Sequence, residues 1–293
     1  MSKTDSVSKI KLNSFNDLFG LNDSMREIRE IRDVLVDELY DFKNHPFKPC
    51  KAEKFEELVN SVREHGVIVP GIARIRPQGG YELIAGHNRR NACKAAGIST
   101  MPVFIRNMND DEAVIAMVDS NIQREDILPS EKAKAYRMRY EAMKHQGKKG
   151  NSLQELGEKY GENAKSIQRY IWLSRLSDEL LQKVDNGKLG LGQGTDISFL
   201  KEREQKWVSD VIDETKQKIS LKQSAEIKKM SLEHELSEDA VRKILILFES
   251  KHKIKKVTFS SEELEAFFSD DHSEKEIKNI ILDLLKEWKK TGK

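Results

Sequence analysis

The chain has 293 residues, too many for one ordinary hydrophobic core and enough for two or three domains of about 100–150 residues each. Hydrophobic residues make up 38% and charged residues 34%, a balance that excludes a disordered chain and is typical of a highly charged helical protein. The net charge of +2 indicates no partner by itself, but its distribution does. Residues 130–175 hold eleven Lys/Arg and five Glu, so this window carries +6 and the remainder −4.

Cysteine usage and hydropathy exclude further classes of protein. Only Cys50 and Cys93 occur, far apart and without a CxxC motif, so neither a disulfide framework nor a zinc site is expected. The sequence has no signal-peptide core and no run of about 18 apolar residues. We therefore expect a cytoplasmic protein with no membrane partner.

The first part of the chain predicts a small α/β domain. Residues 1–30 are polar and irregular, and we expect them to be flexible. Segment 31–42 is left unassigned. The elements expected next are a Pro-rich loop at 44–50, helices at 54–66 and 90–97, and strands at 66–76, 79–85 and 101–106.

Helices dominate the prediction from residue 109 onwards. The first of them begins at an Asn/Asp cap with Glu112 in its first turn, and four glycines between 187 and 194 indicate a loop. Near the end we expect a strand at 253–259, a short helix, and a long amphipathic helix whose apolar stripe is Ile277, Ile280, Ile281, Leu284, Leu285 and Trp288. Burial within its own domain and a dimer interface both explain this stripe.

The segment "SLQELGEKYGENAKSIQRYIWL", residues 152–173, has the spacing of a helix-turn-helix. Gly161 supplies the turn, and two helices can pack through Leu156, Tyr160, Ile167 and Tyr170. The second helix would present donors for base edges and phosphates of double-stranded DNA, namely Lys165, Ser166, Gln168 and Arg169. An ordinary helical hairpin with a solvated charged face is the alternative. Gly157 is unusual in a first helix, where it costs about 1 kcal/mol but preserves close helix contact.

The predicted fold class is α+β and mostly helical. We expect a flexible segment at 1–30, a small α/β domain at 31–125, an all-α helix-turn-helix domain at 126–235, and a small α/β or helical C-terminal domain at 236–293.

Two polar clusters in the α/β domain indicate an anion site. In "ELIAGHNRR" the backbone turns at Gly86 and enters a helix, whose first amides are unsatisfied and whose dipole favours an anion. Arg89 and Arg90 can add charge-assisted contacts to phosphate oxygens. The second cluster is "SNIQRED", residues 120–126. Each cluster alone is more often a polar helix cap or a salt-bridge patch, and neither contains a Walker-type loop.

Together with the helix-turn-helix, these motifs resemble the ParB/RepB partition-protein family, of mobile-element or plasmid type. The resemblance covers roughly residues 33–200: "NHPFKP", "SVREHGVIVPGIAR", "IAGHNRRNACKAAG" and "SNIQRED" stand where that family has its own motifs. It implies a first domain that binds CTP with Mg²⁺, a middle domain that binds a centromere-like DNA site, and a C-terminal domain that forms a homodimer. The implied function is a CTP-responsive DNA clamp for plasmid partition or chromosome segregation, working with a ParA-type ATPase in the nucleoid- or plasmid-associated cytoplasm.

Carried over by position, the resemblance predicts a nucleotide site of Gly86, His87, Asn88, Arg89, Arg90, Asn121, Gln123 and Arg124, with Asn121 as Mg²⁺ ligand. Within it, His87 and Asn88 replace an acidic residue and an arginine of the family. Ser120 stands where a glutamate linked to hydrolysis usually lies, and Val69 replaces a glutamine. A serine hydroxyl is a poor base beside an ionised carboxylate, so a weak CTPase activity is left open and no catalytic residue is assigned.

Three other functions compete with this interpretation. A redox enzyme is disfavoured because sulfiredoxins, which share the α/β domain, carry a reactive cysteine where this chain has Gly86, and Cys93 is expected to be a buried structural thiol. A helix-turn-helix transcription regulator with a degenerate nucleotide site is the main alternative. A nuclease or nucleotide-using transferase is the third, against which residues 30–125 show no Asp/Glu/His cluster with metal-ligand spacing.

Overall fold

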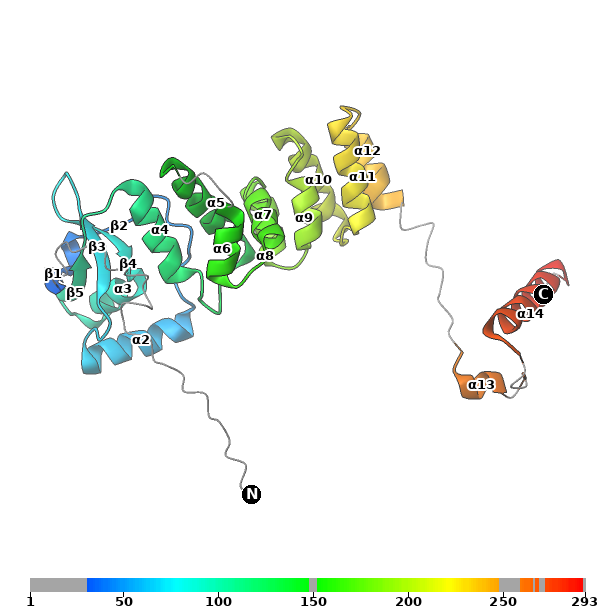
Figure 1. Cartoon of the computed structure of the whole chain (residues 1–293), viewed down its shortest axis with the longest axis horizontal. Helices are drawn as coiled ribbons and strands as arrows, with labels where there is room; N and C mark the ends of the chain where they lie inside the picture. Colours follow the sequence, from blue (N-terminus) through cyan, green and yellow to red (C-terminus); the bar gives the residue numbers. More distant parts are fainter. Residues whose placement is uncertain (1–30, 148–151, 248–258, 266, 269–271, 292–293) are drawn as a thin grey trace, which may run out of the picture. The chain divides into compact units, whose positions relative to one another are not determined.

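The computed structural model describes residues 31–147, 152–247, 259–265, 267–268 and 272–291 (Figure 1). It divides into two compact units, Met1–Leu247 and Phe248–Lys293. The predicted flexible segment at 1–30 lies outside the described residues, as does almost all of the strand predicted at 253–259. None of the helices described is long and apolar enough to cross a membrane.

A five-stranded sheet forms the first part of the larger unit, where sequence had predicted three strands. The strands are β1 (Ile31–Leu35), β2 (Leu39–Asp41), β3 (Gly71–Ile75), β4 (Tyr81–Ala85) and β5 (Thr100–Ile105). Their spatial order is β1-β5-β3-β4-β2, with β1–β5 and β3–β4 antiparallel and β3–β5 and β2–β4 parallel. The unassigned segment 31–42 therefore supplies both edge strands, joined by the short 3₁₀ turn η1 (Val36–Glu38).

Both faces of this sheet are covered. Helices α2 (Ala52–His65) and α3 (His87–Ala96) pack together on one face, where Val62, Leu83 and Cys93 share a buried cluster. On the other face, Ile84 packs in a different cluster with Met117 of α4 (Asp110–Asn121). Neighbouring residues of β4 point to opposite faces, as strand geometry requires. Cys93 is fully buried, as predicted, and burial raises the pKa of its thiol.

Helix α4 begins as the sequence predicted. The Asn109 side chain accepts a hydrogen bond from the Glu112 amide at 2.9 Å, and the Glu112 carboxylate accepts one from the Asn109 amide at 2.9 Å. This reciprocal capping box satisfies two amides that would otherwise lack partners. It fixes where α4 starts.

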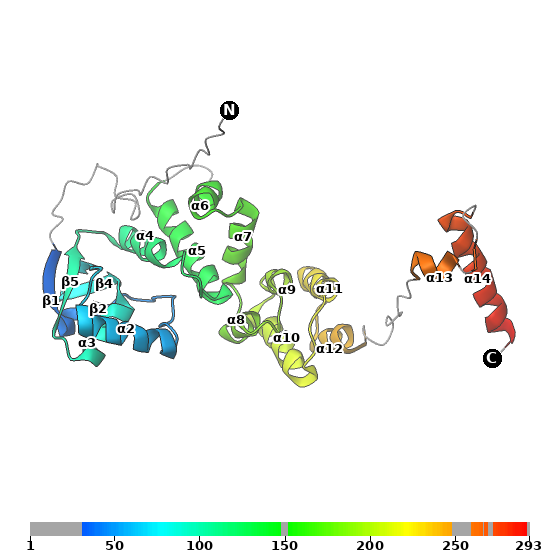
Figure 2. The same ribbon diagram turned by 90° about the horizontal axis from the view of Figure 1, so that it is seen from below.

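Helices α5 (Pro129–His145), α6 (Ser152–Tyr160) and α7 (Ala164–Leu173) follow α4 as a packed group (Figure 2). Leu156 and Ile167 are buried against Tyr136 of α5, and Tyr160 and Tyr170 pack beside them, so the predicted helix pair is confirmed. The remaining helices of this unit share a second core: α8 (Asp178–Asp185), α9 (Leu191–Ile197), α10 (Glu202–Thr215), α11 (Leu221–Leu232) and α12 (Glu238–Leu247).

The loop predicted from the glycines at 187–194 is only partly correct, because α9 begins at Leu191. A Cβ added at Gly194 would lie 2.7 Å from Leu173 Cδ1, and one at Gly192 would lie 2.7 Å from Leu221 Cδ2. These two glycines therefore let α9 approach α7 and α11 closely instead of interrupting the helix. Sequence alone could not distinguish this role from a loop, because it depends on packing against residues distant in sequence.

The smaller unit contains α13 (Ser261–Glu265) and the long α14 (Glu274–Thr291), as predicted. Its apolar stripe is not buried: Leu284, Leu285 and Trp288 are 59%, 53% and 62% exposed.

Candidate functional site

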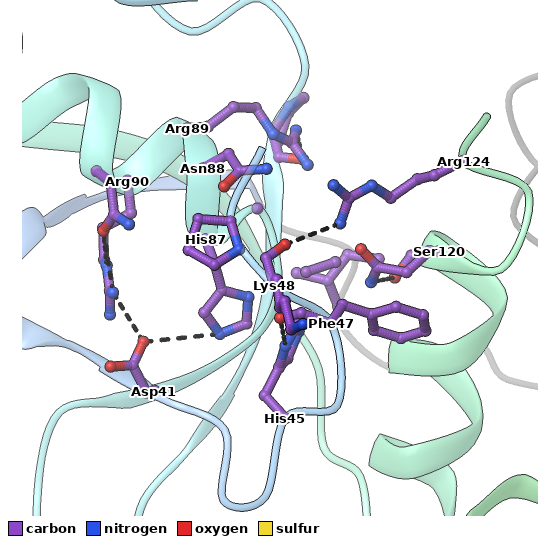
Figure 3. A pocket seen from close by; sticks show the side chains of 17 residues that line it. Asp41, His45, Phe47, Lys48, His87, Asn88, Arg89, Arg90, Ser120 and Arg124 are labelled. Atoms are coloured by element: carbon purple, nitrogen blue, oxygen red, sulfur yellow. Dashed lines mark hydrogen bonds and ion pairs between the residues drawn. The ribbon is translucent and has the colours of Figure 1, made fainter. Parts of the chain in front are cut away.

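A cavity of about 480 Å³ opens where four segments of the α/β part meet (Figure 3). The segments are the loop after β2, the start of β3, the N-terminus of α3 and the C-terminus of α4. Seven of the eight residues predicted for the nucleotide site line it: Gly86, His87, Asn88, Arg89, Arg90, Asn121 and Arg124. The eighth, Gln123, is exposed and lies outside the lining.

The turn at Gly86 needs glycine. Its φ of 111° is in the left-handed region, and an added Cβ would lie 3.1 Å from Met101 Cε and 3.2 Å from Gly71 Cα. Among the described side chains, none caps the N-terminus of α3 that follows. Since uncapped amides and the helix dipole attract negative charge, this corner of the cavity favours an anion.

The three arginines of the cavity have different partners. Arg90 is 9% exposed, and its guanidinium donates to Leu39 O at 3.0 Å and lies 2.7 Å from Asp41 Oδ1. Arg89 donates to the carbonyl oxygens of Val69 and Pro70. Arg124 donates to a backbone carbonyl, Lys48 O, at 3.4 Å.

Only Arg90 is therefore neutralised by a carboxylate. Within the part of the chain that the structure describes, no carboxylate forms an ion pair with Arg89 or Arg124. Burial lowers the pKa of Arg89, because the charged guanidinium loses water around it. The cavity thus presents two uncompensated cations beside an uncapped helix N-terminus.

The end of α4 offers a carbonyl oxygen. Asn121 Nδ2 donates to Met117 O at 2.9 Å and to Ser120 Oγ at 3.1 Å, and Ser120 Oγ donates to Met117 O at 2.9 Å. Asn121 Oδ1 is therefore the atom of this side chain that can ligate a hard cation such as Mg²⁺. Across the described ranges, no group of three or more His, Cys, Asp or Glu side chains is arranged to hold a metal.

A pair of neutral histidines forms another wall. The rings of His45 and His87 lie 4.3 Å apart between centroids, and His45 Nδ1 donates to Phe47 O at 3.0 Å. Burial, then the neighbouring His45 and Arg90, lowers the pKa of His87 to about 4. Its Nε2 is 3.8 Å from Asp41 Oδ1, but a histidine with this pKa is uncharged near pH 7 and forms no ion pair there.

Sequence reasoning missed one side of the cavity. This side is lined by Asp41 at the end of β2 and by His45, Phe47 and Lys48 of the loop that follows. The motif "NHPFKP" was the available signal, since it stands among the segments that carry the family resemblance. Nothing in its residue types indicated that the loop would fold over the α3 turn.

The predicted DNA-binding residues lie on α7. Lys165 and Arg169 are exposed, and Ser166 and Gln168 are half-buried. The helix is capped by Asn163, whose Oδ1 accepts from the Ser166 amide at 2.7 Å. Within the described residues neither Lys165 nor Arg169 has an ion-pair partner, so both charges face solvent and can reach a polyanion.

The architecture is that of a small α/β domain with a cavity lined by three arginines, followed by a helix-turn-helix in a helical region. A family model, the ParB N-terminal domain, matches residues 21–122. A probable chromosome-partitioning protein ParB of Vibrio cholerae is 28% identical over 213 residues, which cover 73% of this chain and 70% of that protein. Residues 21–122 thus match the ParB N-terminal domain, and most of the chain is similar to a ParB protein.

Two solved structures are similar to parts of the chain. A C-terminally truncated ParB of Caulobacter crescentus, complexed to the centromeric parS site, is 21% identical, with a TM-score of 0.43, and covers 68% of this chain and 98% of that one. The same truncated protein complexed with CTP-gamma-S is 24% identical, with a TM-score of 0.31, and covers 59% and 94%.

Proposed function

We propose that this chain is a DNA-binding partition protein whose N-terminal domain is a CTP-responsive switch. The observation that carries the proposal is the cavity itself, where Arg89, Arg124 and the uncapped N-terminus of α3 converge without a neutralising carboxylate on either arginine among the described residues. Such a site fits a polyphosphate because charge-assisted contacts and helix-terminal amides favour anions.

The residues also fit a triphosphate together with its Mg²⁺. We assign the phosphates to the turn at Gly86, where a bound anion would meet the first amides of α3 and the Arg89 guanidinium. Asn121 Oδ1 would hold Mg²⁺, and Arg124 would bind a phosphate oxygen from the α4 side. When bound, the triphosphate supplies negative charge between these two segments. Because the α3 turn and the end of α4 then share one ligand, binding favours their closed arrangement.

The proposal for DNA rests on α7. Lys165 and Arg169 are exposed on α7, which follows a short turn. A recognition helix needs side chains placed in this way to enter the major groove. Ser166 and Gln168 add donors that can reach base edges. The positive charge concentrated in residues 130–175 supports the same surface.

Assembly is part of the proposal. The exposed Leu284, Leu285 and Trp288 stripe of α14 fits a homodimer contact, because a long amphipathic helix gains most by burying such a stripe against a second copy. A ParA-type ATPase as partner, association with nucleoid or plasmid, and the plasmid type of the protein stay predictions from the family resemblance, as do the domain boundaries at 125 and 235.

A second candidate is a helix-turn-helix transcription regulator whose cavity binds no nucleotide. Ser120 favours it, because its hydroxyl already donates to Met117 O and stands where the family usually has a glutamate linked to hydrolysis. The two candidates share their DNA surface and differ only in the response to CTP.

Equilibrium binding of labelled CTP with Mg²⁺, competed by ATP, GTP and UTP, tests the proposal. We expect selective CTP binding by the wild type and its loss in Arg89→Ala. Arg63→Ala is the matched control, since Arg63 is an exposed arginine of α2 outside the cavity. A melting curve of each variant separates lost binding from lost folding. Absence of CTP binding by the wild type, with and without DNA, would leave the regulator as the function.

A further inference from the structure

Lys48 connects the cavity to the helical part of the chain. Its carbonyl oxygen accepts a hydrogen bond from Arg124 Nη1 at 3.4 Å, inside the cavity (Figure 3). Its backbone amide donates to Glu131 Oε1 at 2.6 Å. The same residue is thus held both by a predicted phosphate-binding residue, Arg124, and by Glu131 of α5.

Glu131 is unusual among the carboxylates of α5 because it is only 4% exposed. Besides the Lys48 amide, it accepts from the Leu128 amide at 3.0 Å, which closes the N-terminal turn of the helix. A buried carboxylate must keep its donors, since an unsatisfied charge in the interior is strongly unfavourable. The two amides are therefore fixed to each other through one side chain, although Lys48 and Leu128 are eighty residues apart in sequence.

The neighbouring Ser130 connects the start of α5 to a further helix, α8. Its amide and its hydroxyl donate to the two oxygens of Asp185, the last residue of α8, at 2.9 and 2.6 Å. The Asp185 side chain is 7% exposed, and its Oδ2 also lies 3.9 Å from Lys48 Nζ. The start of α5 thus binds the cavity wall through Glu131 and binds α8 through Ser130.

We propose that Glu131 is a positioning residue: it fixes the Lys48 wall of the cavity to the N-terminus of α5, so that the cavity and the helices around the helix-turn-helix adopt their arrangements together. The nature of the ligand rests on the function proposed above, whereas the attachment of Lys48 to Glu131 does not. A phosphate that draws Arg124 or Lys48 Nζ toward itself would pull on this attachment. Since coupling between two sites is reciprocal, DNA on α7 would change nucleotide affinity by the same factor.

The first experiment needs no ligand. Amide hydrogen exchange at Lys48, followed by NMR, is compared in the wild type, Glu131→Ala and Glu141→Ala. Glu141 is the matched control because it lies on the same helix, is 51% exposed in its side chain and pairs with Arg137. We expect exchange at Lys48 to be at least about tenfold faster in Glu131→Ala, because a hydrogen bond to a charged acceptor is lost. The control should leave it unchanged. Unchanged exchange in Glu131→Ala would overturn the proposal.

The second experiment measures coupling. The Kd for CTP is determined with and without saturating specific DNA, and the ratio is expected to be at least about fivefold in the wild type and about one in Glu131→Ala. An unaltered ratio in the variant would overturn the coupling. If Glu131→Ala does not fold, Glu131→Gln, which removes the charge and keeps one acceptor oxygen for the two amides, takes its place in both experiments with the same readouts. If the wild type binds no CTP, the proposed function fails, and the exchange experiment still decides the role of Glu131.

Discussion

Asp119 of α4 and Arg139 of α5 form an ion pair, with 2.7 Å between Asp119 Oδ1 and Arg139 Nη1. The same carboxylate lies 2.6 Å from Lys159 Nζ and accepts a hydrogen bond from the Tyr160 hydroxyl. Lys159 and Tyr160 end α6, the first helix of the helix-turn-helix. Asp119 directly precedes Ser120, which lines the cavity. The Asp119 carboxylate thus connects α4 to both α5 and α6.

Replacing Asp119 with asparagine should lower the free energy of unfolding by about 3 kcal/mol, because Arg139 would stay buried without a counter-ion. The Arg139 side chain is only 7% exposed, so water cannot replace the lost carboxylate. Urea unfolding followed by circular dichroism measures the change.

The control for this prediction is Asp111→Asn on the same helix. Asp111 pairs with His145, whose side chain is 70% exposed, at 3.1 Å. A solvent-exposed pair contributes less than about 1 kcal/mol, so the loss should be small. Equal losses in the two variants would mean that the Asp119 pair is no stronger than a surface pair.

Gly157→Ala should destabilise the helix-turn-helix by about 2 kcal/mol or more, through steric conflict with a neighbouring backbone. The added Cβ would lie 2.4 Å from Glu162 O in the turn, whose amide donates to Gly157 O at 2.8 Å. Thermal melting gives the stability, and DNA binding should weaken with it. Gly161→Asn is the comparison: its φ of 71° is tolerated by asparagine and no atom lies within 4 Å of an added Cβ. A Gly157→Ala protein as stable as the wild type would show that the turn can shift.

The helix-turn-helix and the start of α4 could be predicted because their signals are local. A cap residue, a turn glycine and helical apolar spacing lie within a few residues of each other. Strands β1 and β2 were not assigned, because their partners are distant: Ile31 pairs with Phe104, and Leu39 with Tyr81. Strand β2 has only three residues, too few for a readable alternation.

In the candidate site, too, the features with a local sequence signal could be predicted and those that depend on distant residues could not. The Gly86 turn follows from a glycine between a strand and a helix, and the structure places it in the cavity. The wall that carries His45 and Lys48 depends on tertiary packing against α3 and α5, which no local pattern encodes. Gln123 matched a family motif but is exposed: α4 ends at Asn121, and in the turn that follows it is Arg124, not Gln123, that lines the cavity.

Stability should depend on pH through His87. Its pKa is lowered to about 4 in the folded chain, mainly by burial, against 6.5 in the unfolded chain. Above pH 6.5 both states are neutral and the full stability is present. As pH falls from 6.5 to 4, the unfolded state binds the proton first, so stability falls by up to about 3 kcal/mol.

His87→Gln should flatten this dependence in urea unfolding at pH 7 and pH 4.5. His65→Gln, at a side chain that is 62% exposed, should not. An identical pH slope in wild type and His87→Gln would contradict the assignment.

Arg169→Ala should weaken DNA binding, and the pattern of the loss reveals what Arg169 contacts. If the guanidinium reads a base, a site selected from a random library should lose about 10- to 100-fold while random DNA loses much less. If it contacts only a phosphate, both DNAs should lose equally, and the slope of log affinity against log salt should fall by about one. Lys94→Ala controls for net charge, since Lys94 is an equally basic residue of α3 that pairs with Asp37 at 3.2 Å, outside α7. Fluorescence anisotropy at three salt concentrations distinguishes these outcomes. No loss on either DNA would remove the outer face of α7 from the DNA interface, because an exposed cation at its centre cannot be bypassed by a duplex lying along that helix.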